Sequence, residues 1–402
     1  MKITKNAILF SSCVFLLAAG CTLSSKGGKS SSRGTSPTPS TQSNVSITPS
    51  QEPIGPQPSS QDTPILTARS SNGIIQILTK EGAVLRFDPQ GKTWVRRGTL
   101  PEDFYYQNRN DLVFFVIPPG NTADPGLIVA SQNKIYGCWA GSSFFWSVSL
   151  PHHASAITFW TAGCFSTPGK PEVLFQTADG KVGLVVLPDP SSPTPFLRWP
   201  VAFSYRMVSS RDYDGNGRDE LLDESMVPWM NTAAYGQWPV FRPNTRGPLP
   251  SRVAASALSE DFNRDGRADV VAWFPDYSSA NWGQLRLYLS GHPYLDLPFR
   301  LPGTVSLQQL APRPAYFLSA DLDRDGFPDL VLVTSLGECH FYLYRTNTMM
   351  PAGYWLLPSQ TWQRRPLLAD YNQDGSPELV LLNASGLEFY KLAPVTGGRT
   401  FY

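Results

Sequence analysis

One nine-residue acidic pattern occurs four times in this chain and constrains its fold more than any other feature. The pattern reads D-x-[DN]-x-[DN]-G-x-x-[DE], and an apolar segment follows each copy. The copies begin at Asp212, Asp261, Asp321 and Asp370, so successive starts lie 49, 60 and 49 residues apart. A nearly constant spacing of this size is typical of a protein built from repeated structural units.

Weaker copies of the same unit precede these four. The segment STPGKPEVLF aligns with NQDGSPELVL and places Glu172 on Glu378, although the acidic residues of the loop are missing. One step further back, NTADPGLIVA places Gly126 at that position, and SSNGIIQILT, around Gly73, gives the first copy. The chain is therefore expected to contain seven units.

Each unit has the pattern of a small antiparallel sheet. In the unit around Asp321, the segments AYFLSA, DLVLV, CHFYLYR and AGYWLLP supply four strands, and SLGE supplies a turn. The strand after the acidic loop is apolar at consecutive positions, as expected when both faces of a sheet are covered. A single β-sandwich would instead show shorter spacing and in-out alternation.

We therefore predict an all-β fold, a β-propeller of four-stranded antiparallel blades. Seven blades are expected. Six or eight are the alternatives, because one spacing of 60 residues departs from the usual 49 and so does not fix the number of units. To close the ring, the C-terminal run GLEFYKLA should share a blade with an N-terminal segment such as PILTAR.

The acidic loops have the ligand spacing of a calcium site. Oxygen side chains at positions 1, 3 and 5, a glycine at position 6 and a carboxylate at position 9 can surround a cation of calcium size. An EF-hand loop would need an acid at position 12 and a helix after it, and only the first loop, with Asp223 at that position, fits both patterns. The alternative is a set of Asp-Gly-rich hairpin turns that bind no metal.

These loops resemble those of the FG-GAP and VCBS repeat family of calcium-binding propellers, which is related to the integrin alpha-subunit head. The resemblance covers the four units with acidic loops, and it reaches the three N-terminal units only through their strand pattern. The Phe-Gly and Gly-Ala-Pro motifs that name the first family are absent, so the VCBS description is closer. The resemblance implies up to four calcium ions, held by Asp212, Asp214, Asn216 and Glu220, by Asp261, Asn263, Asp265 and Asp269, by Asp321, Asp323, Asp325 and Asp329, and by Asp370, Asn372, Asp374 and Glu378. Because affinity rises with ligand charge, the loop at Asp321, with four Asp ligands, is expected to bind calcium most tightly.

The N-terminus has the pattern of an export signal. Lys2 and Lys5 precede an apolar run, residues 7–19, which suits a signal-peptide core and is too short to span a bilayer. The run ends in LAAGC, which resembles the lipobox of bacterial lipoproteins, in which the cysteine is acylated. We therefore expect a lipoprotein signal peptide at residues 1–20, a lipidated Cys21 and a place at the cell envelope. Thr22 resembles the default outer-membrane sorting pattern, and an ordinary secretory signal is the alternative.

Composition then divides the rest of the chain. Residues 22–63 are rich in Ser, Thr, Pro, Gln and Gly and have almost no large apolar side chains, so burial there cannot offset the entropy of ordering. We predict a disordered tether at residues 21–63, including the lipidated cysteine, and a propeller at residues 64–402. In an oxidising compartment Cys138 and Cys164 could pair, and Cys339 is expected to be a buried thiol.

Charge and motif content exclude some functions. The chain has 33 basic and 32 acidic side chains, a net charge near +1, so it lacks the basic surface that nucleic-acid binders need. G-x-S-x-G, H-E-x-x-H and phosphate-binding glycine loops are absent. We assign no catalytic residue, although propeller active sites assembled from several blades leave no local motif.

Two aromatic-rich segments are candidates for ligand binding. They are residues 225–241 and 274–284, which we place in expanded turns between the second and third strands of their blades, at the end opposite the acidic loops. Aromatic rings with a polar tip suit sugar rings or side chains of a protein partner, although they could also fill gaps between blades. The candidate residues are Trp229, Tyr235, Trp238, Tyr277 and Trp282.

Two functions fit these observations. The first is a surface-anchored, calcium-stabilised module that binds a protein or glycan ligand without catalysis, in adhesion or as a scaffold. The second is an extracellular carbohydrate-active protein, a lyase or hydrolase, that uses the aromatic face.

Overall fold

A computed structural model describes most of the chain between residues 45 and 396. Every regular element in the described residues is a β-strand, and none of them forms a helix that could cross a membrane. The described ranges are 45–51, 57–61, 64–69, 75–101, 113–117, 126–130, 134–138, 145–149, 157–170, 172–186, 196–202, 205–237, 239–244, 253–275, 283–290, 293–297, 314–334, 337–357, 365–383 and 386–396.

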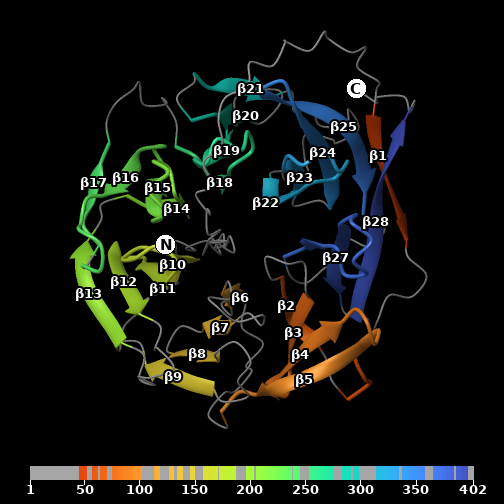
Figure 1. The fold of residues 1–402 in the computed structure, drawn as a ribbon, viewed down its shortest axis with the longest axis horizontal. Helices are drawn as coiled ribbons and strands as arrows, with labels where there is room; N and C mark the ends of the chain where they lie inside the picture. Colours follow the sequence, from red (N-terminus) through yellow and green to blue (C-terminus); the bar gives the residue numbers. More distant parts are fainter. Residues whose placement is uncertain are drawn as a thin grey trace, which may run out of the picture.

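The described strands form seven four-stranded sheets that follow one another around a ring (Figure 1). Every strand pair within these sheets is antiparallel, as the sequence predicts. We number the blades 1 to 7 in chain order, so that blade 1 holds β2 to β5 and blade 6 holds β22 to β25. The predicted all-β propeller fold is confirmed.

Within each blade the strands run from the centre of the ring outward (Figure 1). The first strands are β2 (Pro64–Arg69), β6 (Val113–Ile117), β10 (Ile157–Gly163), β14 (Met207–Arg211), β18 (Ser256–Glu260), β22 (Pro314–Ala320) and β26 (Leu367–Ala369). The second strands are β3 (Ile75–Thr79), β7 (Gly126–Ala130), β11 (Glu172–Thr177), β15 (Glu220–Asp223), β19 (Asp269–Pro275), β23 (Asp329–Thr334) and β27 (Glu378–Asn383).

The third strands are β4 (Ala83–Asp88), β8 (Lys134–Cys138), β12 (Lys181–Val186), β16 (Pro228–Asn231), β20 (Gly283–Tyr288), β24 (Glu338–Arg345) and β28 (Gly386–Thr396). The outermost strands are β5 (Thr93–Thr99), β9 (Phe145–Ser149), β13 (Phe196–Ala202), β17 (Phe241–Pro243), β21 (Leu295–Leu297), β25 (Thr348–Leu356) and β1 (Val45–Gln51).

The second strands are the most buried, which explains their unbroken apolar runs. All residues of β3, β11, β15, β23 and β27 are buried. Their side chains enter cores that lie between neighbouring blades. In one such core, Trp273 and Leu285 of blade 5 pack with Phe317 and Leu332 of blade 6. The blades are therefore held together by apolar burial on both faces of each sheet.

Polar contacts connect the first strands of successive blades around the centre of the ring. Ser209 on β14 donates a hydrogen bond to Ser259 on β18 at 2.7 Å. On the same two strands, Arg211 pairs with Glu260 at 2.6 Å. Ser319 on β22 then reaches the second oxygen of Glu260 at 3.2 Å. This network fixes the register of blades 4, 5 and 6 where apolar packing alone would be less specific.

The N-terminal strand closes the ring in a way that differs from our expectation. The C-terminal strand β28 does share its blade with an N-terminal segment, but this segment is β1 (Val45–Gln51), whereas PILTAR forms β2 of blade 1. The prediction of a disordered tether up to residue 63 is therefore wrong for residues 45–51. The alternation of Val45 and Ile47 was the overlooked signal, and the outer edge of β28 provides the partner that orders this polar segment.

One glycine allows β1 to approach blade 6. A Cβ atom on Gly353 of β25 would lie 2.8 Å from the carbonyl oxygen of Ile47. Ile47 itself is buried in the core between blades 6 and 7. The strand therefore seals the junction of two blades as well as completing one.

Cysteine use agrees with the sequence analysis where it is described. Cys339 is a free thiol with no exposed surface, as expected. Cys164 is disulfide-bonded. The side chain of Cys138, its predicted partner, lies outside the described residues.

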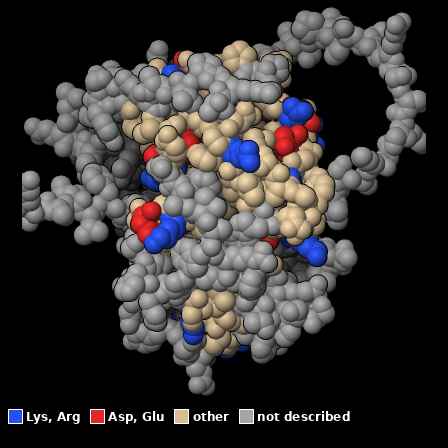
Figure 2. Space-filling view, turned by 90° about the vertical axis from the view of Figure 1, so that its left-hand side faces the viewer, with Lys and Arg blue, Asp and Glu red and all other residues tan. Residues whose placement is uncertain are grey.

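Charged side chains on the face shown in Figure 2 lie in small groups of both signs. Pairs such as Arg286 with Asp296 at 3.0 Å and Lys181 with Asp179 at 2.8 Å are typical of the described surface. Exposed pairs of this kind contribute little to stability.

The role of β1 predicts that two alanine substitutions differ in their effect on stability. Ile47→Ala should lower the free energy of unfolding by about 2–4 kcal/mol, because it removes a buried side chain from the core between blades. Val95→Ala is the matched control, since Val95 on the outer strand β5 is 45% exposed, and its cost should stay within about 0.5 kcal/mol. Thermal or denaturant unfolding of the full chain measures both values. Equal values would mean that residues 45–51 are part of the tether and do not pack as a strand of the propeller.

Candidate metal centre

Four acidic loops connect the first and second strands of blades 4 to 7. We call them loop 4 (residues 212–220), loop 5 (261–269), loop 6 (321–329) and loop 7 (370–378). Each follows the inner strand of its blade and ends on the first residue of the buried second strand. Because corresponding connections of a propeller lie at the same end of the ring, the four loops share one face of the molecule. We call this the loop face.

The four loops adopt the same backbone conformation. Position 4 is left-handed in every copy: Gly215 (φ 78°), Arg264 (57°), Arg324 (63°) and Gln373 (58°). Position 6 is also left-handed, and it is always glycine. Non-glycine residues with positive φ are uncommon and are held there only by a well-determined surrounding structure. The repeated conformation therefore belongs to the motif itself.

Two hydrogen-bond sets hold this conformation in all four copies. The carboxylate at position 1 accepts hydrogen bonds from the backbone N–H groups of positions 5 and 6, as Asp261 does from Asp265 at 3.0 Å and Gly266 at 2.9 Å. The carboxylate at position 9 accepts one from the N–H of position 2, as Asp269 does from Phe262 at 3.0 Å. Equivalent bonds occur in the other three loops.

Loop 4 brings three carboxylates together. Oxygens of Asp212, Asp214 and Glu220 all lie within 4.8 Å of one another. The Glu220 side chain is fully buried, and its Oε2 accepts the Tyr213 N–H at 2.9 Å. Its Oε1 is buried and has no hydrogen-bond partner. An unpaired buried carboxylate oxygen is costly, so this donor set fits a bound cation better than it fits an empty turn.

Loop 6 gathers a second group, Asp321, Asp323 and Asp325, whose oxygens also lie within 4.8 Å of one another. Here a cationic side chain is already present, because Arg345 at the end of β24 forms ion pairs with both Asp323 and Asp325. The Oδ1 atom of Asp323 is nevertheless buried without a hydrogen-bond partner. The pairing with Arg345 was not visible in the sequence.

Loops 5 and 7 do not bring three acidic side chains together in this way. In loop 5, Asn263 donates its amide to Asp265 at 3.1 Å, and Asp269 accepts bonds from Phe262 and Ser290. In loop 7, Lys391 of β28 pairs with Asp374. Among the described residues, the predicted ligands therefore converge as carboxylate clusters in loops 4 and 6 alone.

Burial shifts the titration of the carboxylates at position 9. Burial, together with the nearby Asp214 and Asp212, raises the pKa of Glu220 to about 9. Burial likewise raises the pKa of Asp329 to about 7 and that of Asp269 to about 6. Without a cation Glu220 therefore favours the protonated form at neutral pH, whereas Asp329 is about half protonated and Asp269 is mostly ionised.

Blade 3 provides an internal comparison. Its corresponding loop, residues 164–172, lacks the acids but keeps Glu172 at position 9. There Ser166 donates both its backbone N–H and its hydroxyl to Glu172, at 2.7 and 2.8 Å. Both oxygens of the buried glutamate are thus paired by protein groups. The unpaired oxygen of Glu220 is therefore a property of loop 4 and not of the fold.

The EF-hand alternative is not supported. Asp223, at position 12 of loop 4, lies at the far end of β15, and a turn and another strand follow it instead of a helix. Its carboxylate accepts hydrogen bonds from the N–H groups of Ser225 and Val227 and from the Trp229 indole. Asp223 therefore organises the next turn.

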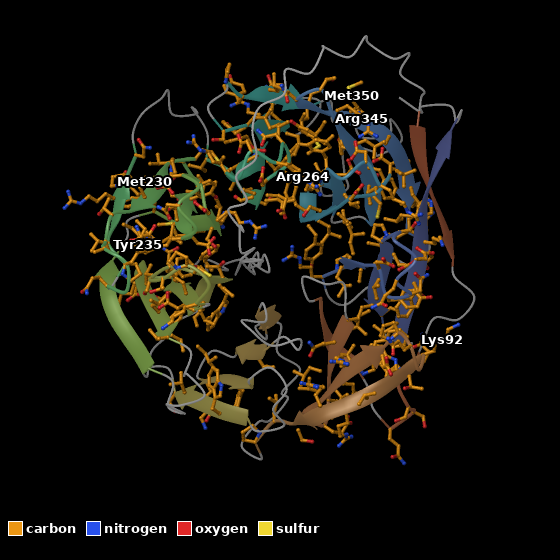
Figure 3. The ribbon with its side chains drawn as sticks, viewed as in Figure 1. Lys92, Met230, Tyr235, Arg264, Arg345 and Met350 are labelled. Carbon is orange, nitrogen blue, oxygen red and sulfur yellow. The ribbon has the colours of Figure 1, made fainter. Side chains whose placement is uncertain are left out.

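The aromatic candidates are divided between the two faces. Tyr235 lies in the connection between the third and fourth strands of blade 4 and donates a hydrogen bond to the carbonyl of Asn216 in loop 4 at 3.3 Å. Its ring covers the Arg218 guanidinium at 4.8 Å and is 61% exposed (Figure 3). The expectation that it lies opposite the acidic loops is wrong, because β16 (Pro228–Asn231) ends before it and returns the chain to the loop face.

One further aromatic candidate lies among the described residues. Trp229 opens β16, is partly buried and lies 6.3 Å from Tyr205, between ring centroids. Trp238, Tyr277 and Trp282 lie outside the described residues.

Comparisons with known proteins agree with this architecture. The model of the FG-GAP-like repeat family matches residues 261–332 and 321–381, and each match runs from one acidic loop into the second strand of the next blade. No curated protein matches the chain. The solved structure of BBS1N in complex with ARL6DN is 12% identical, covers 89% of this chain and 99% of its own, and gives a TM-score of 0.50. The Cps50 (Swd1) β-propeller domain of Myceliophteria thermophila is 9% identical, with 82% and 99% covered and a TM-score of 0.47.

At such identities the structural likeness concerns the fold alone. The ring of antiparallel blades defines the class of the molecule, which is a β-propeller. The matched repeats add that residues 261–381 carry FG-GAP-like repeats. Fold and repeats together are those of a binding or scaffold module.

The raised pKa of Glu220 predicts the pH dependence of the calcium-free protein. The folded state holds a proton that the unfolded state, with a pKa near 4.5, has lost, so stability should fall as pH rises from about 4.5 to about 9. The slope from this one group is at most about 1.4 kcal/mol per pH unit. Thermal unfolding of the full chain in chelator between pH 5 and 9 measures it.

Glu220→Gln is the control, because it keeps the shape of the protonated side chain. The variant should lose the Glu220 part of the pH dependence, and a profile identical to that of the wild type would contradict the assignment.

Proposed function

We propose that the protein is a calcium-stabilised binding module that is anchored to the cell envelope by lipid. The observation that carries the calcium assignment is the buried, unpaired Oε1 of Glu220 beside the carboxylates of Asp212 and Asp214. Three convergent carboxylates with no nitrogen or sulfur donors are the ligand type of a hard cation of calcium size. In loop 4 the ligands would be these three side chains, with Asn216 as the fourth predicted oxygen donor.

A bound cation would supply the positive charge that lets these carboxylates remain ionised next to a buried strand. The chain's own part is to hold the donors in place. The N–H groups of Gly215 and Gly217 fix Asp212, at 2.7 Å each, and the N–H of Tyr213 fixes Glu220. The site is thus preorganised by backbone hydrogen bonds, which lowers the cost of ordering on binding.

The anchoring proposal rests on the sequence of the N-terminus. LAAGC places Cys21 where a lipoprotein cysteine is acylated. Because β1 begins at Val45, the tether is proposed to span residues 22–44. Incorporation of labelled palmitate that is lost in Cys21→Ser tests the anchor.

Calcium should stabilise the fold by a measurable amount. For a dissociation constant of about 10⁻⁴ to 10⁻³ M, 1 mM calcium adds roughly 0.4 to 1.4 kcal/mol per site. Thermal unfolding of the full chain in calcium and in chelator measures this shift. Asp212→Asn should reduce it, because it removes charge from loop 4.

Asp179→Asn is the matched control for this experiment. Asp179 is an acidic side chain in the β11–β12 turn of blade 3, where it pairs with Lys181, so its loss should leave the calcium-dependent shift unchanged. Equal melting temperatures in calcium and chelator would mean that the four loops are turns without metal.

The exposed ring of Tyr235 favours the loop face as the ligand surface. Asn216 fixes the Tyr235 hydroxyl, and Arg218 packs on the ring. A ligand that stacks on this ring therefore loses little binding free energy to the ordering of the tyrosine side chain. We propose a glycan or an aromatic-binding protein segment as the ligand, bound without turnover. A carbohydrate-active enzyme remains the second candidate because the same ring could position a sugar.

Two tyrosines on opposite faces allow a direct test. Tyr235→Ala should weaken binding to the glycans that a glycan array selects, by about tenfold, through the loss of one aromatic contact. Tyr205→Ala is the control, because Tyr205 is 47% exposed and precedes β14 at the end opposite loop 4. Loss of binding in the control alone would place the ligand on the opposite face, and release of shortened oligosaccharides from the bound glycans would favour the enzyme.

A further inference from the structure

Arg345 is placed at loop 6 by a rigid hairpin. It is the last residue of β24, and the turn that follows, Thr346 and Asn347, has positive φ angles of 45° and 64°. The neighbouring Tyr344 is fixed twice: its hydroxyl donates to Asn347 at 3.0 Å, and its N–H donates to the Asp329 carboxylate at 2.8 Å. The hairpin is therefore attached to the position-9 carboxylate of the loop that Arg345 contacts.

The Arg345 guanidinium takes the place of a cation in loop 6. It forms ion pairs with Asp323 and Asp325, and the Asp323 side chain is only 6% exposed. One guanidinium nitrogen also donates to the carbonyl of Tyr344 at 2.6 Å. The second Asp323 oxygen stays buried and unpaired, so Arg345 satisfies the cluster only in part.

Loop 4 has no such side chain among the described residues. The third strand of its blade, β16, has the sequence PWMN and carries no basic residue. Arg267 of loop 5 lies beside Gly215, but no ion pair joins it to loop 4 among the described residues. Two other nearby arginines bind elsewhere. Arg218 donates to the carbonyls of Ala233 and Asn231, at 2.6 and 3.0 Å, and Arg211 pairs with Glu260.

We propose that Arg345 is a tethered competitor of the calcium ion in loop 6. This inference rests on the proposed calcium function. Calcium and the guanidinium use the same Asp323 and Asp325 carboxylates and repel each other, so the ion binds only when Arg345 leaves. Loop 4 fills first, and loop 6 binds at higher calcium concentrations, at which the Arg345 side chain is displaced from Asp323 and Asp325.

This order reverses the expectation from charge counting alone. Loop 6 has four Asp ligands and was expected to bind most tightly, but the count omitted the cation that faces them. Loop 4 has one carboxylate fewer and no competitor, and its Glu220 oxygen has no partner.

The test isolates loop 6 and then removes the competitor. Calcium titration calorimetry at fixed ionic strength is carried out on the full chain carrying Asp212→Asn, which disables loop 4. Adding Arg345→Gln to this background should raise the calcium affinity about tenfold, because a positive charge next to a divalent ion is removed from a partly screened site. Arg242→Gln is the matched control, since Arg242 is an exposed arginine of β17, outside the loops.

A second measurement identifies the loop. Adding Asp321→Asn to the Arg345→Gln protein should abolish the gain. An affinity equal to that of the Arg242→Gln control, or a gain that survives Asp321→Asn, would overturn the inference while leaving the calcium proposal intact. If the wild type and every variant bind no calcium, both the inference and the proposed calcium function are wrong.

Discussion

The structure depends on a buried carboxylate at the start of a buried strand. In blades 3 to 7 the first residue of the second strand is Glu or Asp, and in each acidic loop it accepts the N–H of position 2. This bond joins a polar loop to the most apolar strand of the blade. It fixes where the strand begins, but it leaves a charge or a proton to be accommodated in the interior.

The repeats accommodate that charge in different ways. Blade 3 pairs both oxygens of Glu172 with Ser166. In loop 6 the two oxygens of Asp329 accept the N–H groups of Leu322 and Tyr344, and in loop 7 those of Glu378 accept the Tyr371 N–H and the Asn372 amide. Loop 4 leaves one oxygen of Glu220 unpaired. Loops with the same backbone conformation therefore differ in how completely protein groups pair the buried carboxylate at position 9. Position-4 side chains also link neighbouring loops, since Arg324 of loop 6 donates to the Asp374 carbonyl of loop 7 at 2.9 Å.

Local sequence patterns predicted most of the fold. Contacts between residues far apart in the sequence were predicted poorly. The pitch between Asp212 and Asp370 and the unbroken runs such as DLVLV follow from repeats and from burial on both faces, which act within one blade. The role of β1 depends on an edge of β28 more than 300 residues away, so composition suggested a tether instead. Arg345 likewise follows an ordinary apolar strand, and only the hairpin geometry brings it to Asp323. The face of Tyr235 was misassigned because the short strand β16 could not be delimited from the sequence.

The position of β1 has a mechanical consequence. If the chain is tethered to a membrane through its N-terminus as we propose, any pull on the head enters at Val45, the first residue of β1. A pull along this strand loads all seven of its residue pairs with β28 together, from Val45 opposite Thr396 to Gln51 opposite Tyr390. Such shear distributes force over the whole ladder, whereas a perpendicular pull would open the pairs one at a time. The element that closes the ring is thus also the one through which tension would reach the other blades.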